Sequence, residues 1–403
     1  MSRETGLPNW LEGGSVSRAP AGRRAVVGIL PGEGIGPEVV AASLRVLDAL
    51  EAGAGPLLDR RTGGAIGLEA DKGNNADNGA GSSDGRLTGE IAAFCKGIFD
   101  AGGAVLCGPG GGRFVYDLRR RFDLFCKLVP LKPSPSLRDV GRIKPEWLDG
   151  VDILVVRDNS GGVYQGHSVV RGDGAAGRVV EHRFDYSQAQ VLRIVRVGAR
   201  LAKARGGKMA VVVKDGGVPG ISALWREAAL DVSKESGVAC SILNADYAAY
   251  WMIQNPRECD VLVTPNMVGD ILADLGAVLL GSRGMSYSGN FGPDGRAVYQ
   301  TSHGSAHDLA GTDRANPLAQ ILATAMMLRQ SYGLAAEATR VEQAVEDVLA
   351  AGWCTEDLAS PGRRVVGTRK MGELVAAAVT ALARPQAAKR EEPRMESSSE
   401  AGR

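Results

Sequence analysis

A strand, a turn and a helix with two acids can be read from residues 261–275, VLVTPNMVGDILADL. Residues 261–263 form a short apolar run typical of a buried strand, and residues 264–266 are a turn signal. Asp270 and Asp274 follow at a spacing of four, which places both carboxylates on one face of a helix. In α/β proteins, ligand sites are built in this way at the carboxyl end of a strand.

The two carboxylates need a cation between them, because like charges on one helix face repel each other. Mg²⁺ is a hard cation that binds through one or two carboxylates together with water and substrate oxygens. We therefore predict that Asp270 and Asp274 bind a divalent metal. On spacing alone, a solvated helix face with two acids is the alternative.

Length and composition are those of a soluble enzyme. The chain has 403 residues, enough for two α/β domains, with 44% hydrophobic and 23% charged residues. A net charge of +1 offers no electrostatic basis for binding nucleic acid or an acidic membrane. No apolar run reaches the roughly 18 residues that a membrane helix needs. The amino terminus does not resemble a signal peptide, and six scattered cysteines without a CxxC pair fit reduced thiols, so we expect a cytoplasmic protein.

Short apolar runs alternate with helical patterns, which favours a mostly parallel sheet with helices on both faces. Residues 39–50 form an amphipathic helix by their apolar spacing. The predicted strands are residues 25–30, 104–107, 153–156, 210–213 and 261–263.

Polar and glycine-rich segments interrupt this pattern. Residues 31–38, PGEGIGPE, read G-x-G-x-G and not the G-x-G-x-x-G of a dinucleotide fingerprint, so a tight turn and a cofactor loop are both open. Residues 71–86 are a predicted loop, and residues 162–185 are an excursion with β-like stretches. We expect the charged and serine-rich ends, residues 1–23 and 384–403, to be unstructured.

Short blocks follow one another along the chain: LPGEGIGPE at 30–38, LRRRFDLF at 118–125, VVRDNSGGVYQG at 155–166, VVVK at 211–214, NAD at 244–246, TPNMVGDILADL at 264–275, HGSAHDLAG at 303–311 and ANP at 315–317. Together they resemble the β-decarboxylating dehydrogenases, which include the 3-isopropylmalate, isocitrate, homoisocitrate and tartrate dehydrogenases. The resemblance covers about residues 25–383. It is closest to 3-isopropylmalate dehydrogenase, because of GDILADL and the short HGSAHDLAG block.

The resemblance implies two open, mostly parallel α/β domains with a cleft between them, which is not the Rossmann fold. The first, cofactor-binding domain would comprise residues 24–125 and 281–383, and the second, dimerisation and metal domain residues 126–280. The excursion at 162–185 would be an arm that interlocks two subunits, so a homodimer is implied.

The implied reaction is NAD-dependent oxidative decarboxylation of a 3-substituted malate with Mg²⁺ or Mn²⁺. Asp246 of the second subunit would join Asp270 and Asp274 as a metal ligand, although Asp246 taken alone also fits a helix N-cap. Tyr164 would protonate the enolate at C3. Lys214, also from the second subunit, would take the proton of the substrate hydroxyl.

Arginines would bind the substrate carboxylates, because a guanidinium matches a carboxylate bidentately. The resemblance assigns this role to Arg119 and Arg157. Arg157 ends a strand, whereas Arg119 stands in a run of three arginines that also fits a basic helix face. Arg113 and Tyr116 lie where relatives read the C3 substituent, and they predict a larger or anionic one.

The cofactor would lie against the loop after residue 302. Asp308 predicts NAD rather than NADP, because a carboxylate accepts hydrogen bonds from ribose hydroxyls and repels a 2′-phosphate. The cofactor-binding residues implied by the resemblance are His303, Gly304, Ser305, Ala306, Asp308 and Asn316.

The chain departs from the family pattern at several places, among them Glu33 in place of an aspartate and His307 in place of a proline, and two departures bear directly on the site. Val129 stands where a second clamping arginine is expected, a loss of roughly 1.5–3 kcal/mol in carboxylate binding. Lys214 is followed by Asp215 and Gly216, so an asparagine expected to contact nicotinamide and substrate is absent, and Asp215 predicts a raised pKa for Lys214.

Two alternatives to a 3-isopropylmalate-like activity are open. One is a tartrate-, isocitrate- or homoisocitrate-type dehydrogenase. The other is a non-catalytic regulatory paralogue with the same fold, which Val129 and Gly216 favour. The retained aspartates, Lys214 and Tyr164 favour an active enzyme.

Overall fold

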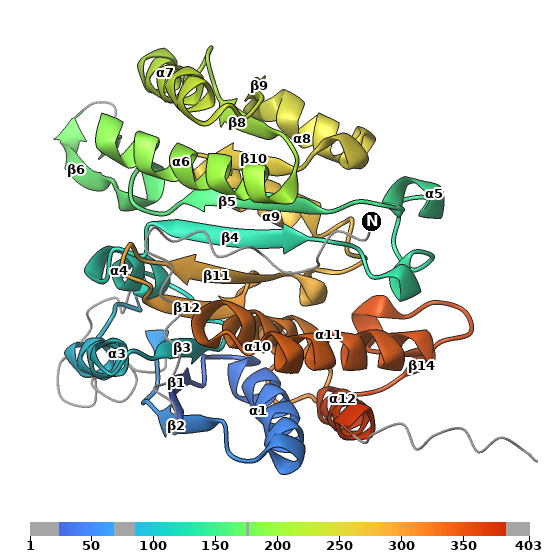
Figure 1. Ribbon diagram of the computed structural model, residues 1–403. Coiled ribbons are helices and arrows are strands. Elements are labelled where there is room, and N and C mark those ends of the chain that lie inside the picture. Colours follow the sequence, from blue (N-terminus) through green and yellow to red (C-terminus); the bar gives the residue numbers. More distant parts are fainter. Residues whose placement is uncertain (1–23, 68–84, 175–176, 384–403) are drawn as a thin grey trace, which may run out of the picture.

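The structure, a computed structural model, describes residues 24–67, 85–174 and 177–383. Our predictions for residues 1–23 and 384–403, and for most of the loop 71–86, lie outside these ranges. One ten-stranded sheet runs through the centre of the molecule (Figure 1). In pairing order its strands are β2 Leu58–Thr62, β1 Ala25–Leu30, β3 Ala104–Cys107, β12 Ala297–Thr301, β11 Tyr287–Phe291, β4 Cys126–Leu131, β5 Ile153–Asp158, β10 Val261–Thr264, β8 Met209–Val213 and β9 Cys240–Asn244.

Strand direction reverses in the middle of this sheet. β12 pairs with β11, β11 with β4 and β4 with β5 in antiparallel fashion, and the remaining neighbours are parallel. The predicted α/β class with a mostly parallel sheet is confirmed. The strands from β2 to β11 come from residues 24–125 and 281–383, and those from β4 to β9 come from residues 126–280. β11 of the first predicted domain pairs directly with β4 of the second, so one continuous sheet joins the two. The division into two domains therefore stays a prediction.

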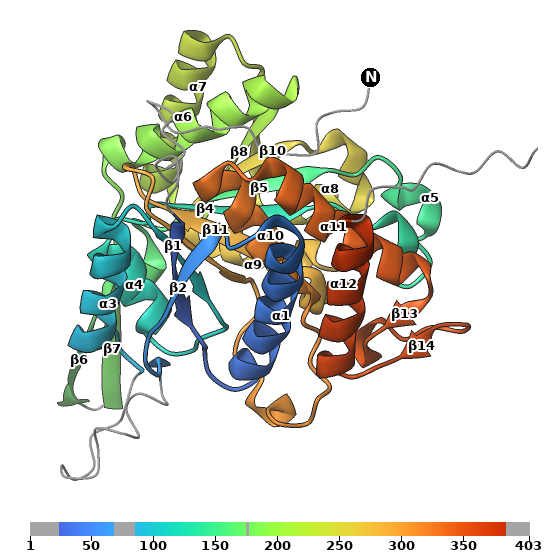
Figure 2. The same cartoon turned by 60° about the horizontal axis from the view of Figure 1, so that its bottom comes forward.

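Helices cover both faces of the sheet. They are α1 Gly36–Ala54, α3 Gly89–Asp100, α4 Phe114–Arg121, α5 Pro145–Leu148, α6 Gln188–Arg205, α7 Pro219–Ser236, α8 Ala245–Gln254, α9 Asn266–Gly276, α10 Leu318–Tyr332, α11 Ala335–Ala350 and α12 Thr368–Ala383. In Figure 1, α6, α10 and α11 lie in front of the sheet and α9 lies behind it. α1 and α12 pack side by side (Figures 1 and 2).

Glycines bring helices close to the sheet on both faces. A Cβ atom at Gly198 of α6 would lie 2.2 Å from Val263 Cγ2 of β10. On the opposite face, a Cβ atom at Gly276 of α9 would lie 2.2 Å from Leu131 Cδ1 of β4. Such separations exclude any larger residue, so α9 is held directly against β4.

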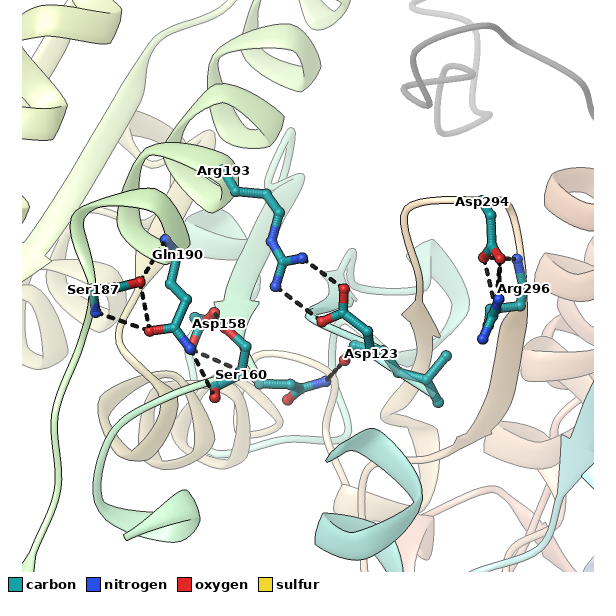
Figure 3. A network of polar contacts seen from close by, with 10 residues as sticks. Asp123, Asp158, Ser160, Ser187, Gln190, Arg193, Asp294 and Arg296 are labelled. Atoms are coloured by element: carbon teal, nitrogen blue, oxygen red, sulfur yellow. Dashed lines mark hydrogen bonds and ion pairs between the residues drawn. The ribbon is translucent and has the colours of Figure 1, made fainter. Parts of the chain in front are cut away.

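The first turns of α6 fix the ends of β4 and β5 (Figure 3). Ser187 and Gln190 form a capping box that starts the helix. Gln190 Nε2 donates to the Ser160 carbonyl oxygen at 3.2 Å, just after β5. Arg193 forms a bidentate ion pair with Asp123, which lies just before β4. Its Nη1 and Nη2 donate to Asp123 Oδ2 and Oδ1 at 2.7 and 3.0 Å. These contacts therefore fix the start of β4 and the end of β5.

The predicted excursion at 162–185 contains an antiparallel hairpin, β6 His167–Gly174 and β7 Gly177–Arg183. It pairs with no strand of the main sheet among the described residues. Its valines at positions 169, 170, 179 and 180 are all exposed. None of the helices in the described ranges is both long and apolar enough to cross a bilayer.

Candidate active site

Arg157 is held near the end of β5 by the first turn of α9. Its side chain is buried, and Nε and Nη2 donate hydrogen bonds to Asn266 Oδ1 at 3.1 and 2.8 Å. Nη1 forms an ion pair with Asp270. A Cβ atom at Gly269 would lie 2.8 Å from Arg157 Cγ, so glycine is needed for α9 to pass this arginine. The guanidinium therefore has one fixed orientation.

Tyr164 contacts the same carboxylate from the 3-10 turn Val163–Gln165. Its hydroxyl donates to Asp270 Oδ2 at 2.9 Å. Burial, and then the negative charge of Asp270, raise the pKa of Tyr164 to about 12, so the phenol keeps its proton at neutral pH. The structure thus brings together three of the predicted site residues, Arg157, Tyr164 and Asp270.

Arg119 points inward from α4. It is buried, whereas Arg120 and Arg121 are exposed, so the basic-face alternative applies to those two and not to Arg119. Burial, with the nearby charge of Arg157, lowers the pKa of Arg119 below its usual value. The Arg119 guanidinium lies 5.6 Å from the ring centre of Tyr116.

Arg113 and Tyr116 line the same cluster. The Arg113 guanidinium lies 5.2 Å from the Tyr116 ring centre, and its Nη1 donates to the Tyr164 carbonyl oxygen at 3.1 Å. The rings of Tyr116 and Tyr164 are 5.1 Å apart. Arg113 and Tyr116, which we predicted to contact the C3 substituent, therefore lie beside the cluster that contains Arg157 and Asp270.

Lys127 is a charged residue of this cluster that the sequence analysis did not select. It lies on β4 directly opposite Arg157 of β5, and it is buried. Burial, and then the charges of Arg119 and Arg157, hold the pKa of Lys127 well below its usual range. The available signal was a lysine inside an otherwise apolar strand, CKLVPL at 126–131. Asn266, read only as part of a turn, was missed as well.

The other two predicted metal ligands have ion-pair partners of their own within one chain. Asp274, one turn further along α9, is paired with Arg283 at 2.7 Å. Asp246 lies in the first turn of α8 and accepts a hydrogen bond from Lys214 Nζ at 2.9 Å. The N-cap of α8 is Asn244, so the N-cap alternative for Asp246 is wrong.

Asp270 and Asp274 suit a hard cation. Among the described residues of one chain, no group of three acidic, histidine or cysteine side chains could enclose a metal ion. The two aspartates still share one face of α9, and their side chains are 42% and 45% exposed. Two accessible carboxylates fit Mg²⁺ or Mn²⁺ completed by water, substrate or another subunit.

The structure shows the surroundings of Val129 and Asp215, two residues at which the chain departs from the family pattern. Val129 is fully buried in β4. The Asp215 carboxylate pairs with Arg226 and not with Lys214, because Arg226 projects toward it from α7. The carboxylate in direct contact with Lys214 belongs to Asp246, and the effect of the neighbouring Asp215 on Lys214 stays a prediction.

The predicted cofactor loop packs on the glycine turn after β1. The Ile35 amide donates to the Ser305 carbonyl oxygen at 2.9 Å, and the Ser305 hydroxyl lies 3.4 Å from Glu33 Oε1. Gly34, with φ of +59°, leaves no room for a side chain, because a Cβ atom would lie 2.0 Å from that carbonyl oxygen. The turn at 31–38 thus supports this loop.

The remaining predicted cofactor residues lie on the same loop or follow it in the chain. Gly304 and Asp308 are exposed, and Ala306 adopts a left-handed conformation with φ of +40°. Burial lowers the pKa of His303, whose Nδ1 lies 3.0 Å from the Gly304 carbonyl oxygen. Asn316 donates to Asp357 at 3.0 Å.

Comparison with known proteins gives a consistent result. Residues 100–375 match the family model described as isocitrate/isopropylmalate dehydrogenase. The chain is 38% identical to the 3-isopropylmalate dehydrogenase of Cupriavidus metallidurans, over 88% of this chain and 99% of that protein. It is 39% identical to the enzyme of the same name from Pseudomonas putida, over 88% and 98%. The crystal structure of isocitrate dehydrogenase from Methylococcus capsulatus aligns with a TM-score of 0.76 at 28% identity, over 88% of this chain and 99% of that one.

The fold and these similarities define an oxidoreductase of the decarboxylating dehydrogenase class. The chain belongs to the isocitrate/isopropylmalate dehydrogenase family, as its sequence blocks predicted.

Proposed function

We propose that this protein catalyses NAD-dependent oxidative decarboxylation of a 3-substituted malate, a 3-isopropylmalate-like 2-hydroxy acid, with Mg²⁺ or Mn²⁺. The observation that carries the proposal is the contact of Arg157 and Tyr164 with Asp270 on α9, beside the buried Arg119. This arrangement combines carboxylate-binding cations, a protonated phenol and an accessible metal-binding carboxylate in one place.

Arg119 and Arg157 bind the carboxylates of the substrate. Both guanidinium groups are buried, so an anion that meets them interacts in a medium of low dielectric constant. Arg157 is oriented by Asn266 before any substrate arrives. Such preorganisation lowers the entropic cost of binding.

Asp270 and Asp274, with Asp246 of the partner subunit, would hold the metal. A metal held there would supply Lewis-acid stabilisation of negative charge on the substrate. Tyr164 holds a proton at its hydroxyl, consistent with its raised pKa, and delivers it to C3 after CO₂ leaves. Lys214 Nζ of the partner subunit takes the proton of the C2 hydroxyl.

The loop of His303, Gly304, Ser305 and Ala306, with Asn316, binds the adenosine half of NAD. NAD held there would supply the acceptor for the hydride of C2. The exposed Asp308 carboxylate accepts hydrogen bonds from the ribose hydroxyls and would repel a 2′-phosphate. We accordingly propose NAD and not NADP.

The functional unit in this proposal is a homodimer. The hairpin β6–β7 exposes four valines, a surface that a second copy of the chain would cover. The described cysteines are all free thiols, which is consistent with a cytoplasmic protein.

The test is NADH production from a panel of 3-substituted malates, with malate, tartrate, isocitrate and homoisocitrate, in the presence of Mn²⁺ or Mg²⁺. We expect turnover with NAD that disappears on chelation and in Asp270→Asn. Turnover of tartrate or of a tricarboxylate in preference to 3-alkylmalates would replace the substrate assignment. Absence of turnover throughout would support the regulatory paralogue.

A further inference from the structure

A buried lysine without an acceptor lies among the arginines of the site. Lys127 and Arg157 are direct cross-strand partners and are 3% and 1% exposed, and Arg119 is 6% exposed. Asp270, the carboxylate in contact with this group, is already paired with Arg157 and Tyr164. In the described ranges of the chain, no hydrogen bond or ion pair joins the Lys127 ammonium to an acceptor.

This arrangement is unfavourable for the protein alone. Like charges directly opposite each other in an antiparallel pair destabilise it, and a buried charge without a partner is costly. Three cationic groups, Arg119, Lys127 and Arg157, face the carboxylate of Asp270, and the other nearby carboxylate, Asp274, is paired with Arg283, so positive charge is in excess whenever Lys127 is protonated. An anionic ligand would neutralise this excess, whereas replacing the lysine by an apolar residue would remove the cost without a ligand.

The alternation of side chains along β4 decides on which face of the sheet the Lys127 side chain lies. Alternate residues of a strand share a face, so Lys127, Val129 and Leu131 project to the same side of β4. Leu131 packs against Gly276 of α9, so this is the α9 side of the sheet, where Asp270 and Asp274 lie. Val129 is the position where the family resemblance leads one to expect an arginine. Lys127 places a cation on the same face, two residues away.

We propose that Lys127 is a substrate-binding residue, whose ammonium acts with Arg119 on a carboxylate of the malate skeleton. The inference rests on the proposed function and deepens it. Lys127 takes over the charge that Val129 lacks. Because the malate carboxylates are common to every substituted malate, Lys127 supports binding without selecting the C3 substituent.

The experiment compares Lys127→Met and Lys127→Arg with Lys132→Met. Lys132 is a matched control, because it directly follows β4 but its side chain is 48% exposed. In Lys127→Met we expect KM for the hydroxy acid to rise about 10- to 150-fold, the range for one lost charge-assisted hydrogen bond, with KM for NAD unchanged. Lys127→Arg should recover part of that loss, and Lys132→Met should behave as the wild type.

Two measurements distinguish binding from a structural role. The melting temperature of unliganded Lys127→Met should equal or exceed that of the wild type, because a buried like charge is removed. Malate with Mg²⁺ should raise the melting temperature of the wild type and of Lys132→Met but not of Lys127→Met, a readout that needs no turnover. Because this thermal shift needs no turnover, it separates failure of the inference about Lys127 from failure of the proposed reaction.

Three results would overturn the inference. A lower unliganded melting temperature with unchanged KM would make Lys127 a structural residue. A KM increase confined to one class of C3 substituent would move it from the malate carboxylate to the substituent. A malate-induced thermal shift that persists in Lys127→Met would exclude a contact with the skeleton.

Discussion

Asn266 Oδ1 accepts hydrogen bonds from two nitrogens of Arg157, and Asn266 Nδ2 donates to the Gly161 carbonyl oxygen at 2.9 Å. All three groups are buried. Replacing Asn266 by alanine would leave two N–H groups of a buried cation without an acceptor. Asn266 is therefore a positioning residue that acts through Arg157.

We predict that Asn266→Ala loses about 3 kcal/mol of unfolding free energy, because donors on a buried charge lose their partner. KM for the hydroxy acid should rise while KM for NAD stays the same, since Arg157 loses its fixed orientation. Urea denaturation and steady-state kinetics measure the two effects. A stability loss with no change in KM for the acid would show that Arg157 does not need this support.

Asp158 gives a pH dependence of stability. Burial raises the pKa of this carboxyl to about 6, although Ser160 and Gly161 donate hydrogen bonds to it. A folded pKa above the unfolded value of 3.8 means that the folded state holds the proton longer. The contribution of Asp158 to stability is thus greatest below about pH 4, and it decreases as the pH rises to about 6.

Asp158→Asn removes this titration. We predict that the unfolding free energy of Asp158→Asn, relative to the wild type, rises by roughly 2 kcal/mol between pH 4 and pH 7. Denaturant titrations of both proteins across this range measure the difference. A difference that does not change with pH would contradict the raised pKa.

At the residue scale, local sequence patterns marked residues that the structure brings together, but they did not show the contacts between them. Arg157, Tyr164 and Asp270 stand at element ends or on an acidic helix, which are positions that local patterns mark. Lys127 was missed because its meaning depends on a cross-strand partner 30 residues away along the chain, and register is not visible in one strand. For the same reason the sequence did not show that Asp215 pairs with Arg226 and Lys214 with Asp246.

At the element scale, the docking of the glycine turn on the cofactor loop depends on Gly34. An alanine there would combine positive φ with a Cβ atom 2.0 Å from the Ser305 carbonyl oxygen. Gly206, the C-cap of α6 with φ of +64°, is a matched control, because a Cβ atom there meets nothing within 4 Å. Both substitutions carry the strain of a left-handed alanine, and Gly34→Ala adds a backbone overlap.

We predict that Gly206→Ala costs about 1 kcal/mol of unfolding free energy and leaves kinetics unchanged. Gly34→Ala should cost more than about 2 kcal/mol and raise KM for NAD selectively. Chemical denaturation and NAD titrations test this. Equal behaviour of the two variants would mean that the turn does not support the cofactor loop.

The elements themselves were largely predictable. β1 and β3 have the predicted bounds, and β5, β8 and β10 extend the predicted runs by one or two residues, because apolar strands buried on both faces stand out in composition. α1 begins before the predicted helix, at Gly36, because Pro37 suits a first turn. The three antiparallel joins were not predicted, since strand direction depends on pairing between distant segments.

At the scale of the whole molecule, the single chain leaves the proposed site in two parts. Asp270 and Tyr164 are in contact, and Lys214, which directly follows β8, forms a separate pair with Asp246 of α8. Among the described residues, no hydrogen bond or ion pair links the two groups. A homodimer in which each subunit supplies Lys214 and Asp246 to the site of the other would complete both.

Complementation between two inactive variants tests this arrangement. Asp270→Asn and Lys214→Ala should each abolish turnover as homodimers. If Lys214 acts across the interface, a heterodimer of the two has one doubly altered site and one site with only native residues. Random co-assembly should then restore about one quarter of wild-type activity per chain, because half of the dimers carry one intact site of two.

The hairpin β6–β7 should control this complementation if it forms the interface. Val170→Asp with Val180→Asp, a cross-strand pair of exposed valines, should give monomers by light scattering and abolish the restored activity. Leu230→Asp, which also places a charge on an exposed apolar residue but on α7, is the control and should leave the dimer intact. If co-assembled variants restore no activity while remaining dimeric, Lys214 acts within its own chain and the shared site is wrong.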